Sequence, residues 1–466
     1  MMDEWDKTGC RRAGSIRPGS QSVRLTFTKR AWVLLLACLL IGVARPSAAY
    51  SLLTHEELID ILWKDQIEPL LLKRFPAATN AQLHQAHAYA YGGCLIQDLG
   101  YYPFGSKFFS DLTHYVRTGD FITNLIRDSA DLDEYAFALG ALAHYSADNS
   151  GHPLVNRAVA LAYPKLRAKY GDTVTYEDAP RAHIGTEFGF DMTQVSKNRY
   201  TSDQYHDRIG FQVSRPLLER AFLETYGLRL NEVLLDVDLA IGTFRRAISQ
   251  VLPEMTRAAL TAYHPEEVKD TPNLNKKKFM YNLSRAQYEK EWGKDYRQPT
   301  FLTRVLGFIL RWVPKIGALK ALAFKIPTPA MEDLYFKSMN QTVEDYRKLL
   351  RQAGGGTLQL TNNDCDTGRA TRLGEYALAD ATYKKLLEEL FKRGFGKAPP
   401  DLRQSLLAFY DSAPPPKRTR KAQKAWRRTA AELEVLRSGP GSTAEEALRA
   451  RLLRPARGLE SPKAKP

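Results

Sequence analysis

The sequence predicts an all-α fold, and three observations support this prediction. Apolar residues recur at intervals of three and four along most of the chain, as one face of a helix requires. No strictly alternating run of comparable strength occurs in residues 1–265, so strands are not indicated there. The composition, 44% hydrophobic and 11% aromatic over 466 residues, can fill a sizeable core. A bundle of helices is therefore the leading architecture.

The first 49 residues are typical of a secretory signal peptide. Scattered Arg and Lys precede an apolar run over 32–43, and the small residues of 47–49 follow it. The run is too short to predict a membrane span. We expect cleavage after Ala49, which would give a secreted or periplasmic protein that begins at Tyr50. Lipoprotein-type cleavage before Cys38 and an uncleaved anchor are the alternatives.

Strong helical periodicity marks residues 54–75, 131–148, 154–170 and 231–263. Thr54 and Glu57 match a capping box, which would place His55 in the first turn of the first helix. The run 149–151 should break the second helix, and Pro153 should begin the third.

The net charge of +15 is concentrated at the two ends of the chain. Residues 1–49 hold eight basic and three acidic side chains, and residues 411–466 hold fourteen and six. The intervening part is close to neutral, so nucleic acid is a less favoured partner. We expect a helical domain over 50–265, a mainly helical region of unknown role over 266–410, and a basic, mostly disordered tail beyond it.

Two segments of the region 266–410 stand out. Residues 301–327 intersperse basic with apolar side chains, which suits either a packed helix or a peripheral membrane contact. Residues 352–368 are rich in Gly, Thr, Asn and Asp and are predicted to form a loop.

Metal-binding types of side chain concentrate in the helical domain. His144 and Asp148 are four residues apart, as are His183 and Glu187, so each pair projects from one face of a helix. The other candidates are His55, Asp98, His114 and His152. Imidazole and carboxylate without thiolate suit zinc ahead of iron or manganese.

The remaining histidines and cysteines are assigned structural roles. His84, His87, His206 and His264 are expected to be structural or exposed. Cys94 lies in an apolar stretch and is typical of a core residue, although it could pair with Cys365 in an oxidising compartment.

The stretches "HYSADNSGH" (144–152) and "HIGTEFGFD" (183–191) resemble the zinc-dependent phospholipase C family. That family shares its helical fold and trinuclear zinc site with fungal single-strand nucleases and 3'-nucleotidases. The two stretches look most like the catalytic domain of glycosylphosphatidylinositol-specific phospholipase D, in which three residues also separate His from Asp and Asp from His. The phospholipases C place five residues in the second interval and begin with Trp where this chain has Tyr50.

The resemblance implies a set of zinc ligands and an activity. One zinc would be held by Asp98, His114, His144 and Asp148; a second by His152, His183 and Glu187; a third by Asp148, His55 and the terminal amino nitrogen and carbonyl oxygen of Tyr50. Asp98 would act either as a ligand or as the general base.

The implied function is a secreted phospholipase, C-type preferred, that hydrolyses a lipid phosphodiester with metal-activated water. A zinc nuclease or 3'-nucleotidase, a phospholipase D-type hydrolase of glycosylphosphatidylinositol, and a non-catalytic metal-stabilised membrane-binding module are the alternatives. Tyr101, Tyr102 and Phe104 would either frame a headgroup or pack in the core.

Overall fold

A computed structural model describes the fold of residues 52–253 except 198, 201–205 and 207, of residues 325–412 except 396–397, of residues 420–438, and of the single residues 256, 288 and 290. Over these residues the protein is a helical bundle with one small antiparallel sheet, in which β1 (Asn363–Asp364) pairs with β2 (Arg369–Ala370). The all-α prediction is confirmed. The expected signal peptide, Tyr50 and nearly all of 301–327 lie outside the described residues. None of the described helices is both long and apolar enough to span a bilayer.

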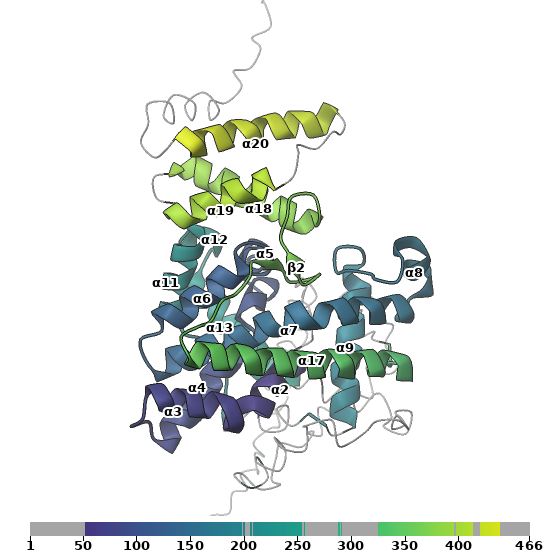
Figure 1. Ribbon diagram of the computed structural model, residues 1–466. Coiled ribbons are helices and arrows are strands. Elements are labelled where there is room, and N and C mark those ends of the chain that lie inside the picture. Colours follow the sequence, from purple (N-terminus) through teal and green to yellow (C-terminus); the bar gives the residue numbers. More distant parts are fainter. Residues whose placement is uncertain are drawn as a thin grey trace, which may run out of the picture.

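The bundle is built around α7 (Leu132–Ala162), a helix of 31 residues. Two neighbours pack along it, α4 (Asn80–Gly93) and α17 (Pro329–Gly354), and α17 runs beside α7 in Figure 1. The approach of α4 depends on glycine, because a Cβ at Gly140 would lie 2.1 Å from the carbonyl oxygen of Ala90. The hydroxyl of Tyr346 donates to the carbonyl of Leu139 at 2.9 Å and fixes α17 against the same helix.

Residues 149–153 do not interrupt α7, so the predicted break was wrong. Pro153 lies inside the helix and cannot donate to the carbonyl of Asn149 one turn earlier. Burial of the surrounding turns against other elements outweighs this lost hydrogen bond. The predicted third helix instead divides at Tyr163, where α7 ends and α8 (Pro164–Tyr170) begins.

The first predicted helix is present but begins earlier than expected. It comprises α2 (Leu52–Leu62), a π-helical turn, η1 (Trp63–Ile67), and α3 (Glu68–Arg74). The expected capping box is wrong, because Thr54 is already helical and its hydroxyl donates to Asp191 at 2.6 Å. Asp191 also accepts from the backbone N–H of Leu53 at 2.8 Å, so a carboxylate from another helix serves the first turn of α2.

Further helices complete the N-terminal part of the bundle. They are η2 (Ile96–Tyr101), α5 (Lys107–Tyr115), α6 (Thr118–Asp128), α9 (Pro180–Ser196), α11 (Arg215–Tyr226), α12 (Leu230–Val233), α13 (Val237–Arg246) and η3 (Ala247–Val251). The predicted long helix from residue 231 is therefore divided at 234–236.

The C-terminal region packs on the same core as the N-terminal helices. It contributes α17, followed by α18 (Ala377–Arg393), α19 (Pro400–Asp411) and α20 (Arg420–Ser438). These last three helices are stacked at the top of Figure 1. The prediction of disorder was wrong for 420–438, because Leu433 and Leu436 of α20 are buried. The predicted loop is confirmed after Gly354, where α17 ends. Cys94 and Cys365 are both buried and free, so they form no disulfide.

Candidate metal centre

Three groups of buried side chains, among the residues that the structure describes, bring nitrogen and oxygen ligand atoms within 4.8 Å of one another. We call Asp98, His114 and His144 the first group, His152, His183 and Glu187 the second group, and His55, His144 and Asp148 the third group. Every described residue that the sequence predicted as a ligand belongs to one of them. Tyr50, the remaining predicted ligand, lies outside the described residues.

The unbroken α7 explains how the groups are connected. It presents His144, Asp148 and His152 on one face at successive intervals of four residues. Asp98 comes from η2 and His114 from α5, while α2 supplies His55. The second group is completed by α9, which carries the remaining histidine and glutamate one turn apart.

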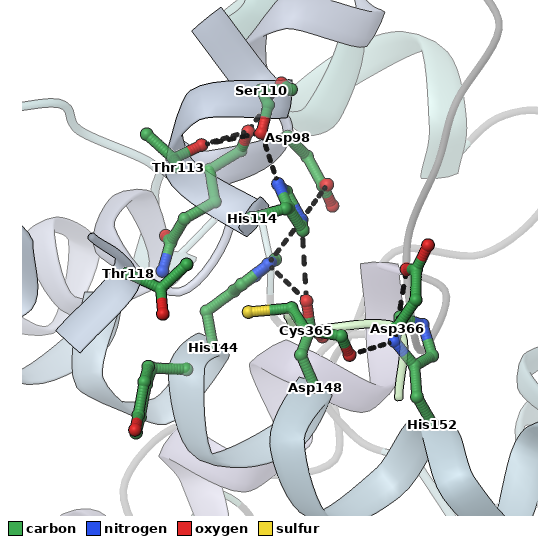
Figure 2. Close-up of polar contacts among 12 residues, drawn as sticks. Asp98, Ser110, Thr113, His114, Thr118, His144, Asp148, His152, Cys365 and Asp366 are labelled. Carbon is green, nitrogen blue, oxygen red and sulfur yellow. Dashed lines mark hydrogen bonds and ion pairs between the residues drawn. The ribbon is translucent and has the colours of Figure 1, made fainter. Parts of the chain in front are cut away.

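Asp148 lies close to the histidines of the first and third groups. Its Oδ2 is 3.1 Å from Nε2 of His144 and 3.4 Å from Nε2 of His114, as Figure 2 shows. Its Oδ1 is 3.8 Å from Nε2 of His55, whose ring stacks on that of His144 with centroids 4.4 Å apart. The Nε2 of His114 is also 3.4 Å from Oδ1 of Asp98. One carboxylate thus faces imidazoles from three helices.

The hydrogen bonds of the first group determine which ring nitrogens can bind a metal. Nδ1 of His114 lies 2.7 Å from the carbonyl of Ser110, and Nδ1 of His144 lies 2.9 Å from that of Cys94. Because carbonyls only accept, each Nδ1 carries the proton, and each neutral ring presents a lone pair at Nε2. These two Nε2 atoms face each other at 3.3 Å. Two lone pairs at this separation, beside Asp148, favour a cation between them.

The second group shows the same arrangement. Nε2 of His183 bonds to Oδ1 of Asn156 at 2.8 Å, and its Nδ1 lies 3.0 Å from Oε1 of Glu187. Nδ1 of His152 donates to the carbonyl of Cys365 at 2.5 Å, which leaves its Nε2 3.6 Å from the same glutamate oxygen. Both imidazoles are therefore held from behind, with the other nitrogen directed at the carboxylate.

The pKa values of these side chains are shifted both by burial and by neighbouring opposite charges. Burial alone would lower the pKa of His114, but the nearby carboxylates of Asp98 and Asp148 raise it to about 9. Burial lowers the pKa of His183 to about 4 and raises that of Glu187 to about 8. The first group therefore attracts a positive charge at neutral pH. A metal ion would take the place of the proton there.

The donor set of these residues fits zinc. Several buried ligand atoms have no hydrogen-bond partner in the described structure: Oδ1 of Asp98, both carboxylate oxygens of Asp148, Nε2 of His152, Nδ1 of His183 and Oε1 of Glu187. Leaving such atoms buried and unpaired is costly unless a cation binds them. They are imidazole nitrogens and carboxylate oxygens without thiolate, which is the chemistry that zinc accepts.

Three residues that support the second group were not predicted from the sequence: Asn156, Cys365 and Asp366. Asn156 follows His152 by four residues on α7, and this spacing was a usable signal. Cys365 and Asp366 belong to the loop between β1 and β2, more than two hundred residues along the chain. Their contribution depends on tertiary packing, and no local pattern indicates it.

The other described histidines have structural surroundings, as expected. His87 lies 3.1 Å from Oδ1 of Asp60 and stacks on Trp63. His206 lies 3.0 Å from Oε1 of Glu56. Both are buried and stand outside the three groups. His84 is half-buried, and His264 lies outside the described residues.

The aromatic residues after Asp98 differ in their surroundings. The ring of Tyr101 is buried, 6.0 Å from that of His114, and Tyr102 packs edge-on against Phe244. Phe104 is 52% exposed. Two of the three therefore pack, and a headgroup contact remains a prediction.

Comparison with known proteins gives one match. A sequence profile of the zinc dependent phospholipase C family matches residues 54–235. The chain matches no curated protein and no solved structure. The matched segment contains the described members of all three groups but ends well before the loop that carries Asp366.

Proposed function

We propose, from the membership of residues 54–235 in the zinc-dependent phospholipase C family, that the protein is a phospholipase that hydrolyses a lipid phosphodiester by the C-type reaction. The observation that carries the proposal is the set of buried acceptor atoms that face one another in the three groups. Among the residues that the structure describes, these acceptors lack hydrogen-bond donors, and such unpaired atoms are costly in a core. The set is suited to binding divalent cations.

We assign the residues of the three groups to three zinc ions, as the resemblance to the family implies. Asp98, His114, His144 and Asp148 would hold one, and His152, His183 and Glu187 a second. His55 and Asp148 would hold a third, together with the terminal amine and carbonyl of Tyr50. When bound, zinc lowers the pKa of a coordinated water from about 15.7 towards about 7 and neutralises phosphate charge.

The chain's own side chains would perform the remaining tasks. Asp98 is 4% exposed and its Oδ1 has no hydrogen-bond partner among the described residues, so it can either bind metal or accept a proton from the attacking water. The carbonyls of Ser110 and Cys94 hold His114 and His144 in the tautomers that expose Nε2. Asn156 orients His183 in the same way.

Product analysis on three substrates would test the proposal. The purified protein is assayed with a choline phospholipid, a phosphatidylinositol-anchored substrate and single-stranded DNA. Diacylglycerol with phosphocholine is the expected result. Phosphatidic acid would instead indicate D-type cleavage, and nucleotides a nuclease. A zinc-loaded protein that cleaves none of the three would contradict the proposal.

We also propose that export assembles the third group. Cleavage after Ala49 would create the free amine of Tyr50, five residues before His55. Sequencing the N-terminus of the mature protein is the test. A start at Tyr50 would support the terminal-amine ligand, whereas a start at Cys38 or a retained signal would exclude it.

A further inference from the structure

We propose that Asp366 is a positioning residue for His152, so that the C-terminal region supplies part of the second metal group. This inference rests on the metal centre of the proposed function. The family match covers residues 54–235, and Asp366 lies outside it in the loop between β1 and β2. The loop and the family domain would then form one functional unit.

The loop is fastened to the residues around the metal groups. The backbone N–H of Cys365 donates to the carbonyl of His114 at 3.0 Å. The side-chain amide of Asn156 donates to the carbonyl of Asp366 at 2.8 Å, and that of Asn363, in the adjoining β1, donates to the side chain of Asn149 at 2.8 Å. The loop therefore contacts α5, which carries a first-group ligand, and α7, which carries ligands of all three groups.

The irregularity in α7 provides the place where the loop docks. Pro153 leaves the carbonyl of Asn149 without its helical donor. The backbone of Gly368 lies against this carbonyl, since a Cβ there would be 2.3 Å from the oxygen. The φ of Gly368 is +69°, a conformation that also favours glycine. Proline in the helix and glycine in the loop are thus complementary features of one contact.

The loop contacts the edge of His152 that is turned away from the other ligands. Nδ1 donates to the carbonyl of Cys365 and lies 3.5 Å from Oδ1 of Asp366. Nε2, on the other side of the ring, faces Glu187. A carboxylate beside the N–H of a metal-binding imidazole fixes the ring and increases the basicity of its free nitrogen. Asp366 is therefore placed to act through His152.

Tyrosine hydroxyls hold Asp366 in this orientation. Oδ2 accepts from the hydroxyl of Tyr115 at 3.0 Å and from that of Tyr376. The side chain is 1% exposed, so these bonds replace the water that a charged carboxylate would otherwise bind. With Oδ2 engaged, Oδ1 is left on the side of the histidine. The carboxylate is thus prepared to contact the ring.

A zinc-binding titration of the full mature protein would test this role. Metal-free wild type, Asp366→Asn and Asp364→Asn are titrated with zinc against a chromophoric chelator, and cobalt serves as a spectroscopic probe of the ligands. Asparagine preserves shape and removes the charge. We expect Asp366→Asn to weaken one zinc-binding step about 10–100-fold and leave the others unchanged.

Asp364→Asn is the matched control. Asp364 is the last residue of β1, directly before the loop, and its Oδ1 accepts from the backbone N–H groups of Asp366 and Thr367. The described contacts of His152 with this segment are made by Cys365 and Asp366. Asp364→Asn should bind zinc like the wild type. Equal weakening in both variants, or none in Asp366→Asn, would overturn the proposal.

If Asp366→Asn does not fold, Tyr376→Phe replaces it. That variant removes one donor and keeps the carboxylate, and it should weaken the same step a fewfold; no change would overturn the proposal. A wild type that binds no zinc would instead refute the metal centre itself, which is a separate outcome.

Discussion

Asp60 and Asp148 are both buried carboxylates beside histidines, but their surroundings are opposite in kind. Oδ1 of Asp60 accepts from the hydroxyls of Tyr91, at 2.7 Å, and Tyr288, and it lies 3.1 Å from a ring nitrogen of His87. Asp148 is approached by Nε2 atoms of rings whose N–H groups point elsewhere. Hydroxyl donors thus converge on Oδ1 of the first carboxylate, whereas ring nitrogens that can act as acceptors face both oxygens of the second.

The difference shows what distinguishes a metal site from a structural cluster. Burial and a nearby histidine occur in both places, so neither feature identifies a site. What distinguishes a metal site is whether N–H and O–H groups point toward the carboxylate. A carboxylate that accepts from hydroxyl groups is stabilised by these hydrogen bonds. A carboxylate that faces lone pairs is stabilised only by a cation. Variants of matched residues on the two sides can test this distinction.

The largest expected effect is the loss of activity when His144 is replaced, compared with replacement of His206. His144→Ala should reduce hydrolysis to the background of the assay, because the residue belongs to both the first and third groups. This loss should exceed the ~10–100-fold decrease that changes around a metal ligand cause. Activity and bound zinc are measured on the same preparations.

His206→Ala is the control from the structural side. It leaves Glu56 buried without its histidine, so the free energy of unfolding should fall by about 1–3 kcal/mol, while zinc content stays at the wild-type value. Equal activity in the two variants would refute the assignment.

The next effect concerns metal removal. Chelation should lower the thermal midpoint of the wild type, because ligands that bind only the folded state stabilise it. At free zinc a thousandfold above the dissociation constant, each site contributes about 4 kcal/mol. Added zinc should restore the midpoint in wild type and in His206→Ala. A midpoint unaffected by chelation would contradict a zinc centre, whatever the activity.

Much of this centre was predictable from local sequence. The spacing of His144 to Asp148 and of His183 to Glu187 identifies helical faces, and both pairs converge in the structure. The expected break at Pro153 failed because turn propensity is a local signal, while packing on both sides keeps α7 continuous. The loop with Asp366 was predicted only as a loop. Its place beside His152 depends on contacts across more than two hundred residues.

A smaller effect distinguishes two carboxylates on α9. Glu187 belongs to the second group, whereas Asp191, one turn later, accepts from the N–H of Leu53 and the hydroxyl of Thr54. Glu187→Gln should weaken one zinc step at least about 100-fold and change the unfolding free energy of the metal-free protein little. Asp191→Asn should cost about 1–3 kcal/mol of stability and leave the zinc step of the second group unchanged. Zinc titration gives the affinity, and denaturant unfolding gives the free energy of unfolding. If Asp191→Asn weakened the same zinc step as Glu187→Gln, the assignment of Glu187 alone to the second group would be contradicted.

The smallest effect is expected from removing the hydroxyl of either of two buried tyrosines, each of which donates to an aspartate. Tyr91→Phe removes a donor from Asp60, and Tyr115→Phe removes one from Asp366. Each should cost about 1–2 kcal/mol, since a hydrogen bond to a charged group is lost in a buried place. Only Tyr115→Phe should also weaken zinc binding, because Asp366, unlike Asp60, contacts a histidine of a metal group. Unfolding would therefore report the same change in both proteins, and zinc titration would separate them. If Tyr91→Phe lost zinc as well, the two clusters would be coupled through α2, which carries both Asp60 and His55, and the division between a structural and a metal-binding side would fail.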